Sequence, residues 1–315
     1  MPNDWKQEAL ELRKEGLSYV DISDTIQKLY FPDEPAMRVY NKVKKYCRNF
    51  SKNETNRVII QNFDPSITSK HWDGSSTIKF AVVSDTHINS KFTQLTSLHD
   101  FYNICSEIGI KDIYHVGDID EGEQMRVGHQ YECYTQGGDA HIESILKYYP
   151  RIKGITTHFI TGNHDASLYK KSGVDIGKRI AENRKDMKYL GQDTAVVKLT
   201  DNCKMELRHP WDGTAYAISY KSQKMIESID DNAKPDIMFV GHYHKQEYIW
   251  YRGVHSFQAG TFCAQTNYMK GKGISAAIGG WIISLIVDAE GYLKAITPSF
   301  IPYEAIQDDY KNYLK

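Results

Sequence analysis

The pattern of hydrophobic and polar positions divides the chain near Thr77. Before that point, apolar residues such as Val39 and Val43 recur at the spacing that is typical of amphipathic helices. We therefore predict three helices between residues 3 and 50, followed by a polar, turn-rich stretch. The predicted divisions are a small helical domain over residues 1–55 and a linker over residues 56–76.

From Thr77 onward, short apolar runs rich in β-branched residues alternate with stretches of helical spacing. This alternation predicts an α/β fold, in which crossover helices join parallel strands. The glycine-rich stretch 269–280 follows neither pattern and is expected to form a loop. The predicted divisions here are a main domain over residues 77–300 and a C-terminal tail over residues 301–315.

Composition and charge narrow the class of protein. The 315 residues are 41% hydrophobic, which permits a large core, and the net charge of -1 excludes a generally basic protein that coats nucleic acid. The polar N-terminus has no apolar leader and no run is long enough to cross a bilayer, so we expect a cytoplasmic protein without a membrane partner. The five cysteines include no C-x-x-C pair, which favours reduced thiols.

Candidate chemistry first appears where the apolar run in "IKFAVVSDTHINS" ends. Asp85 and His87 are two positions apart, so on an extended chain both side chains leave the strand end on the same side. The next apolar run, "DIYHVGD", ends in Asp118 after a glycine that permits a sharp turn. Asp-x-His alone is common by chance, but a second carboxylate at a second strand end supports a metal site.

Three further strand-like runs also end in residues that can bind a metal. They are "GITTHFITGNHD", "KMELRH" and "DIMFVGHYHK". Ligands bind at the carboxyl ends of strands in open α/β sheets, so these side chains are expected to converge. The additional candidates are Asn163, His164, Asp165, His209, His242 and His244.

Even without His164 and Asp165, these donors exceed what one tetrahedral ion needs, whereas two ions that share Asp118 would use all the others. Mixed histidine, carboxylate and amide donors suit manganese, iron or zinc better than magnesium, which prefers oxygen donors. We therefore expect two divalent ions, with Mn²⁺ first and iron or zinc as alternatives. Such a pair attracts a phosphate anion and activates water for attack on phosphorus. His164 is then free to protonate the leaving oxygen, with Asp165 orienting its ring.

The order D-x-H, GD, GNHD, a single histidine after a strand and GH-x-H resembles the calcineurin-like metallophosphoesterase superfamily over residues 78–287. The resemblance implies a sandwich of two mixed sheets flanked by helices, with His164 as the catalytic acid. It also implies a first metal held by Asp85, His87, Asp118 and His244, and a second held by Asp118, Asn163, His209 and His242.

Two departures from the family pattern affect its interpretation. His209 is followed by Pro210, where the family usually has glycine, so His158 and His255 are kept as alternative ligands. The protein phosphatases of the family carry GDxVDRG and GNHE, whereas this chain has "GDIDEGEQ" and GNHD. The sequence therefore disfavours a protein phosphatase and fits the phosphodiesterase and DNA-repair nuclease branches.

The third predicted helix presents basic side chains on one face. These are Arg38, Lys42, Lys45 and Arg48. One interpretation is an ordinary solvated helix face. The other is a loosely helix-turn-helix-like unit whose third helix binds DNA.

The leading hypothesis is a DNA-directed, nuclease-like phosphodiesterase of the kind encoded by bacteria and their phages. The first alternative is a phosphodiesterase or pyrophosphatase that acts on small nucleotides, with the N-terminal helices used for assembly. The second is a non-enzymatic scaffold that binds phosphoesters or a protein partner, which would have no use for an acid such as His164. Oligomeric state and endo- or exonucleolytic action stay open.

Overall fold

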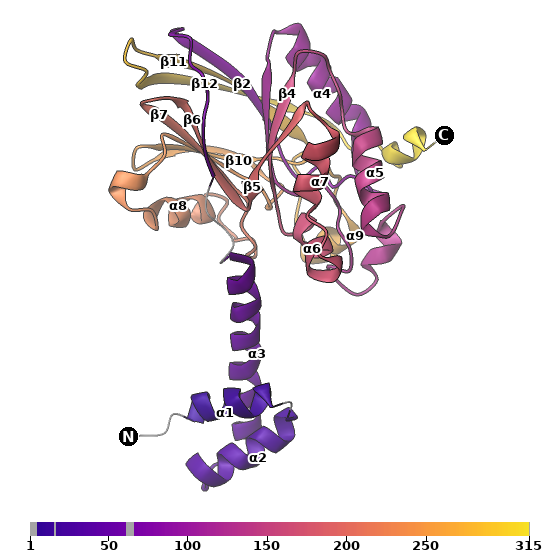
Figure 1. Ribbon diagram of the computed structural model, residues 1–315, viewed down its shortest axis with the longest axis vertical. Helices are drawn as coiled ribbons and strands as arrows, with labels where there is room; N and C mark the ends of the chain where they lie inside the picture. The colour runs from indigo at the N-terminus through magenta and orange to yellow at the C-terminus, as the bar shows by residue number, and fades with distance from the viewer. Residues whose placement is uncertain (1–4, 16, 61–65, 315) are drawn as a thin grey trace. The chain divides into compact units, whose positions relative to one another are not determined.

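The computed structural model describes residues 5–15, 17–60 and 66–314. The chain divides into two compact units, Met1–Asp64 and Pro65–Lys315 (Figure 1). Among the described residues, no helix is both long enough and apolar enough to cross a membrane.

The N-terminal unit contains the three predicted helices, which are α1 (Trp5–Lys14), α2 (Tyr19–Tyr30) and α3 (Ala36–Ile60). Ser18 caps α2, because its hydroxyl oxygen accepts a hydrogen bond of 3.2 Å from the backbone N–H of Asp21. The three helices enclose a small apolar core formed by Ala9, Ile22, Ile26, Val39, Val43 and Cys47.

The C-terminal unit is a sandwich of two six-stranded sheets, as predicted (Figure 1). The first sheet has the order β1-β6-β7-β8-β10-β9. Its strands are β1 (Ser66–Ser69), β6 (Thr194–Thr200), β7 (Cys203–Arg208), β8 (Ile237–Val240), β9 (Gln246–Tyr251) and β10 (Val254–Ala259). The parallel pairs β1–β6, β7–β8 and β8–β10 lie beside the antiparallel pairs β6–β7 and β9–β10, so this sheet is mixed.

The second sheet has the order β12-β11-β2-β3-β4-β5. Its strands are β2 (Thr77–Val83), β3 (Asp112–Val116), β4 (Thr156–Thr161), β5 (Met187–Gln192), β11 (Gly279–Val287) and β12 (Leu293–Pro302). Strands β2 to β5 run parallel, whereas β11 pairs antiparallel with both β2 and β12. The parallel part follows the alternation of strands and helices that the sequence predicts.

Helices cover the outer faces of the sandwich. On the second sheet these are α4 (Leu95–Glu107), α5 (Gly138–Tyr148), α6 (Asp165–Ser172) and α7 (Ile176–Asn183), and on the first sheet α8 (Tyr220–Glu227) (Figure 1). One core lies between the second sheet and its helices and includes Phe101, Ile145 and Phe159. A second core lies between the two sheets and includes Phe80 and Phe239. This packing fixes the ends of the strands relative to one another.

Three short elements differ from the predicted pattern. The predicted linker overlaps the end of α3 and contains β1, which pairs with β6 at the edge of the first sheet. An edge strand needs backbone pairing more than apolar side chains, and Ile67 is exposed, so the hydrophobic pattern does not reveal it. The glycine-rich segment contains α9 (Asn267–Lys272), where the Thr266 hydroxyl accepts a hydrogen bond of 3.2 Å from the backbone N–H of Met269.

The predicted C-terminal tail is also structured. It contains the end of β12 and a 3-10 helix, η3 (Asp309–Tyr313). Asp309 is buried and accepts hydrogen bonds of 2.7 and 2.5 Å from the backbone and hydroxyl of Thr96, at the start of α4. Tyr310 is fully buried against the helical layer. These contacts make residues 301–314 part of the domain.

Candidate metal centre

The predicted donor residues all follow the carboxyl ends of strands. Strands β2, β3 and β4 are parallel neighbours in one sheet, and β7 and β8 are parallel neighbours in the other. Their ends therefore deliver side chains to one place from both layers of the sandwich. The donors are Asp85 and His87 after β2, Asp118 after β3, Asn163 and His164 after β4, His209 after β7, and His242 and His244 after β8.

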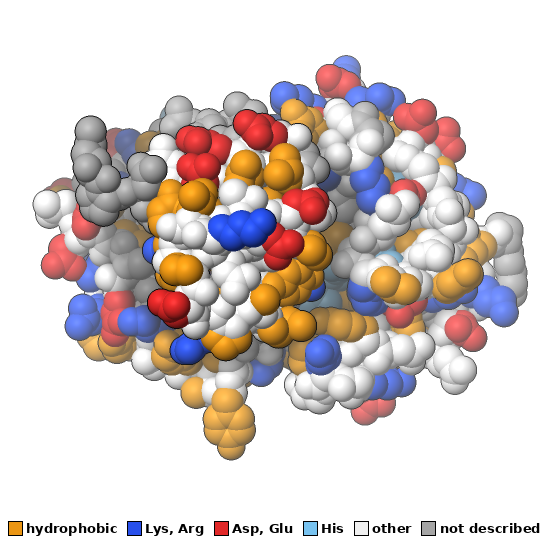
Figure 2. Space-filling model, turned by 90° about the horizontal axis from the view of Figure 1, so that it is seen from below, with side chains coloured by type: hydrophobic (Ala, Val, Ile, Leu, Met, Phe, Trp, Pro, Cys, Tyr) orange, Lys and Arg blue, Asp and Glu red, His pale blue; other side chains and the backbone are white. Residues whose placement is uncertain are grey.

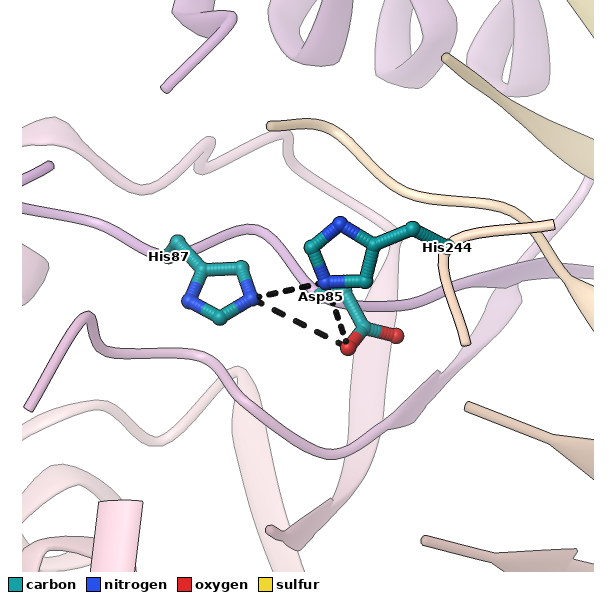
Figure 3. A group of neighbouring side chains, drawn as sticks. All are labelled: Asp85, His87 and His244. Atoms are coloured by element: carbon teal, nitrogen blue, oxygen red, sulfur yellow. Dashed lines mark hydrogen bonds and ion pairs between the residues drawn. The ribbon is translucent and has the colours of Figure 1, made fainter. Parts of the chain in front are cut away.

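The first donor group consists of Asp85, His87 and His244 (Figure 3). Nε2 of His244 lies 3.2 Å from Oδ1 of Asp85 and 3.1 Å from Nε2 of His87. Nε2 of His87 lies 3.8 Å from the same carboxylate oxygen. Three donor atoms thus face one another, an arrangement suited to a shared cation.

The second donor group consists of Asp118, His209 and His242. Nε2 of His209 lies 3.1 Å from Oδ2 of Asp118 and 3.2 Å from Oδ1 of Asn163. Asp118 also groups with His87 on its other side, where Oδ2 lies 4.0 Å from Nε2 of that histidine. Asp118 therefore lies between the two sets of donors.

Five of these donors have a left-handed backbone conformation. The φ angles are 49° at Asp85, 46° at His87, 54° at Asp118, 75° at His242 and 55° at His244. Such angles are unfavourable for residues with a Cβ atom and are concentrated at functional sites, where the surrounding structure enforces them. The turns that follow the strands hold these side chains in place at a cost to the backbone.

The glycines of three motifs surround the ring of His209. A Cβ atom at Gly117 would lie 2.7 Å from its Cγ, at Gly162 2.6 Å from its Cδ2, and at Gly241 2.8 Å from its Nδ1. Nδ1 is 2.7 Å from the carbonyl oxygen of Val116, which fixes Nδ1 as the donor and leaves Nε2 to face Asp118. The proline that follows His209 does not prevent this placement.

Burial and charge match a cation site. Asp85 and Asp118 are 0% and 1% exposed. Burial alone would raise the pKa of Asp85, but the nearby His244 and His87 lower it well below its usual value. Burial likewise opposes protonation of His209, but the Asp118 carboxylate raises its pKa to about 10. Divalent ions fit here because they replace such protons between carboxylates and imidazoles.

His164 lies beside the metal donors but is held by a different contact. Its Nδ1 is 2.5 Å from the carbonyl oxygen of Glu121, which only accepts, so Nδ1 donates and Nε2 exchanges protons. Burial lowers the pKa of His164 to about 4, although the Asp118 carboxylate opposes this shift. The free ring is therefore neutral at neutral pH.

Asp165 does not orient His164, contrary to the sequence-based interpretation. Its carboxylate accepts backbone hydrogen bonds of 2.9 Å from Asp120, 2.8 Å from Gly162 and 3.2 Å from Ile119. These contacts tie the turn after β3 to the turn after β4. The cause is local, because Asp165 begins α6 and its side chain turns back toward the backbone rather than toward the preceding ring.

The sequence interpretation missed two buried residues next to the donors. Oε2 of Glu121 lies 3.0 Å from Nδ1 of His87, and Oε1 lies 2.7 Å from Nε2 of His129. His129 and Glu121 are 0% and 2% exposed, and they form a further donor group with His164. His129 lies in η1 (His129–Glu132). The only available signal was that Glu121 follows Asp118 by three positions.

The two alternative ligands, His158 and His255, lie outside the donor groups. His158 pairs with Asp112 at 2.8 Å and His255 with the hydroxyl of Tyr248 at 2.8 Å, so within the described part of the chain neither alternative ligand joins a donor group.

Of the four basic residues on α3, Lys42 lies 2.6 Å from a Glu34 carboxylate oxygen and Arg38 lies 3.8 Å from one. Lys45 and Arg48 are exposed.

Comparison with protein families gives a match to the calcineurin-like phosphoesterase superfamily domain over residues 78–278, which includes every donor listed above. The chain belongs to this superfamily. Its reaction class is accordingly metal-dependent phosphoester hydrolysis. A search of curated protein sequences finds no match to this chain.

Several solved structures resemble this calcineurin-like phosphoesterase at low similarity. An archaeal phosphodiesterase is 13% identical with a TM-score of 0.40, covering 71% of this chain and 100% of the other. Vacuolar protein sorting 29 from Cryptosporidium parvum is 13% identical with a TM-score of 0.38, covering 73% and 100%. Vps29 from Entamoeba histolytica in complex with zinc is 13% identical with a TM-score of 0.33, covering 71% and 99%. Likenesses at this level identify neither substrate nor partner.

The donor groups of this calcineurin-like phosphoesterase open into a cavity of about 320 Å³. Histidine side chains are visible as small recessed areas between hydrophobic and basic side chains in the right-hand part of Figure 2. The rest of the cavity lining comes mainly from α9 and from the segments that follow β3, β7 and β10. It includes Arg126, Trp211, Asp212, Thr214, Thr266, Tyr268, Met269 and Ile274.

Proposed function

We propose that the protein is a phosphodiesterase that uses two divalent metal ions, with Mn²⁺ as the first choice, and that DNA is its substrate. The observation that carries the proposal is the position of Asp118 between two groups of donors that line one cavity. Asp85, His87, Asp118 and His244 would hold one ion, and Asp118, Asn163, His209 and His242 the other. When bound, such ions neutralise phosphate charge and activate water.

The protein's own residues supply the remaining steps. His164 lines the cavity, and its Nδ1 contact with a backbone carbonyl leaves Nε2 to exchange a proton with an ester oxygen. The arrival of an anionic phosphate favours the protonated ring, which offsets the effect of burial on its pKa. Asp165 contributes indirectly by joining the two turns that carry Asp118 and His164.

Two observations bear on the choice of substrate. Lys45 and Arg48 on α3 are exposed, which supports contact with phosphates of DNA. The cavity volume of about 320 Å³ is near the lower end of the range of about 300–1,000 Å³ that small-molecule sites occupy. This volume favours the second candidate, a phosphodiesterase acting on small nucleotides.

A substrate panel separates these functions. Protein loaded with Mn²⁺, Zn²⁺ or Fe²⁺ is tested on single- and double-stranded DNA, cyclic nucleotides, dinucleotides and bis-p-nitrophenyl phosphate, and its metal content is measured. We expect two ions per chain and cleavage of DNA. Asp118→Asn is expected to lose at least one ion and the activity. The control, Asp139→Asn, changes a carboxylate that is 83% exposed and should retain two ions and full activity.

The outcomes discriminate among the three functions. Cleavage of dinucleotides without cleavage of DNA of any length would assign a small-nucleotide phosphodiesterase. If no metal supports turnover of bis-p-nitrophenyl phosphate, the result would support a non-enzymatic scaffold that binds phosphoesters.

A further inference from the structure

Arg126 has a position in the cavity that metal binding does not explain. It is the only lysine or arginine among the described residues that line the cavity. The same loop carries Asp118 eight residues earlier, so one segment delivers both the shared metal donor and this cation. The side chain is 23% exposed, which is low for an arginine and implies that it is held in place.

Two neighbours fix the guanidinium group. Glu132 forms an ion pair with it, and the guanidinium carbon lies 4.9 Å from the ring centre of Tyr268. Tyr268 itself lines the cavity and is 47% exposed, so its ring is accessible to a ligand. An arginine held by a carboxylate and a ring is preorganised to bind a phosphate through parallel N–H groups.

The surroundings of Arg126 also suit a nucleobase. Tyr268 lies next to the guanidinium group, and Met269 and Ile274 add apolar surface to the same cavity. Trp211 adds a second aromatic ring, and Nζ of Lys170 lies 4.2 Å from its centre. Flat aromatic surfaces beside a cation recognise a base and its phosphate together.

We propose that Arg126 binds a second phosphoryl group of the substrate, next to the one held at the metal centre, while Tyr268 packs against a nucleobase. This assignment rests on the proposed phosphodiesterase function. The chemistry shared by the candidate ligands is a nucleoside with two phosphoryl groups. The second group is either the neighbouring phosphate of a polynucleotide or the β-phosphate of a nucleoside diphosphate.

The test is a binding measurement on the full chain loaded with Mn²⁺. Affinities for adenosine 5′-monophosphate, adenosine 3′,5′-bisphosphate and ADP are measured by calorimetry. We expect the wild-type protein to bind the bisphosphate about tenfold more tightly than the monophosphate, as one charge-assisted hydrogen-bonded pair provides. ADP preferred over the bisphosphate would assign a diphosphate instead of a polynucleotide, with Arg126 in the same role.

Variants decide whether Arg126 is responsible. In Arg126→Met the affinity ratio between bisphosphate and monophosphate should fall to about one, whereas Arg126→Lys should keep part of it. The matched control is Arg252→Met, because Arg252 is exposed in the turn between β9 and β10, and it should keep the full ratio. Tyr268→Ala should weaken binding of both nucleotides relative to inorganic phosphate. A wild-type ratio near one, or an unchanged ratio in Arg126→Met, would overturn the assignment.

Failure of this inference can be told apart from failure of the phosphodiesterase proposal. Turnover of bis-p-nitrophenyl phosphate by the wild-type protein tests the phosphodiesterase alone, because that substrate has neither a second phosphate nor a nucleobase. Turnover together with an affinity ratio near one would reject the role of Arg126 and keep the phosphodiesterase.

Discussion

Glu121 pairs with the ring nitrogen of His87 that faces away from Asp85, with Oε2 of the carboxylate 3.0 Å from Nδ1 of the imidazole. The opposite ring nitrogen, Nε2, faces Asp85 and His244. A carboxylate in this position fixes the orientation of a metal-binding histidine and makes its free nitrogen more basic. His129 completes the arrangement by holding the other oxygen of Glu121.

Replacement of Glu121 should weaken metal binding although the residue is not one of the expected ligands. We predict that Glu121→Gln lowers metal affinity by about 10–100-fold, the usual range for such supporting contacts. The measurement is competition with a chelator whose metal affinity is known. Glu143→Gln, at an exposed site on α5, is the control and should bind metal as the wild type does. Equal affinities for the two variants would contradict the role given to Glu121.

His164 should matter most when the leaving group is a poor one. A positioned general acid contributes about 10²–10⁴-fold, so His164→Ala should slow cleavage of an alkoxide-leaving phosphodiester by that factor. The loss should be much smaller for p-nitrophenolate, which leaves without protonation. His71→Ala, at an exposed histidine, should affect neither substrate. An equal loss for both substrates would show that His164 acts otherwise than as an acid.

Asp112 links stability to pH at a place remote from the donor groups. Burial raises the pKa of Asp112, but hydrogen bonds from His158 and Lys70 outweigh this effect and lower it to about 2. Because the pKa in the folded protein is below the usual value of about 4, the stabilisation is present above pH 4 and is lost as pH falls toward 2.

The corresponding experiment compares urea unfolding of wild type and Asp112→Asn at several pH values, with a chelator present. We expect a difference of about 1–2 kcal/mol at pH 7 that shrinks below pH 4. The exposed Asp201→Asn is the control and should show no such dependence. A difference that stays constant down to pH 2.5 would mean that the carboxylate charge is not the cause.

The exposed basic residues of α3 offer a test of DNA binding by the N-terminal unit. Each phosphate contact contributes about -0.9 to the slope of log affinity against log salt concentration. Replacing both Lys45 and Arg48 with alanine in the full chain should therefore make the slope shallower by about 2. The control is Lys28→Ala on α2, which should leave the slope unchanged. An unchanged slope in the double variant would support a solvated helix face instead.

The sequence predicts the metal centre well because its donors follow strand ends. Asp85, Asp118 and His242 each lie two residues beyond a strand, so a correct strand assignment also places the side chain. Glu121 and Arg126 are different, because they lie in the long loop after β3, and their positions depend on contacts with His129 and Glu132. No local pattern encodes the path of such a loop.

The sequence-based prediction also missed two short elements. Strand β1 is stabilised by backbone pairing with β6, and α9 by the Thr266 cap and the burial of Met269, despite Gly271 within the helix. Strand β1 depends on a partner distant in sequence, which overrides local propensity, whereas the Thr266 cap of α9 is a local signal masked by the glycines around it. The predicted role of Asp165 fails because adjacency to His164 in sequence does not determine where a helix-initiating side chain points.

The ring of His209 couples three sequence motifs through their glycines. Gly117, Gly162 and Gly241 belong to separate motifs, yet one imidazole ring forbids a side chain at all three. The motifs are thus not independent signals, because a single steric requirement links them. Loss of this histidine alone would not free the three positions, because a Cβ atom would still meet the Asp118 carboxylate at Gly162 and the Val116 carbonyl oxygen at Gly241, and Gly117 has a left-handed φ of 87°.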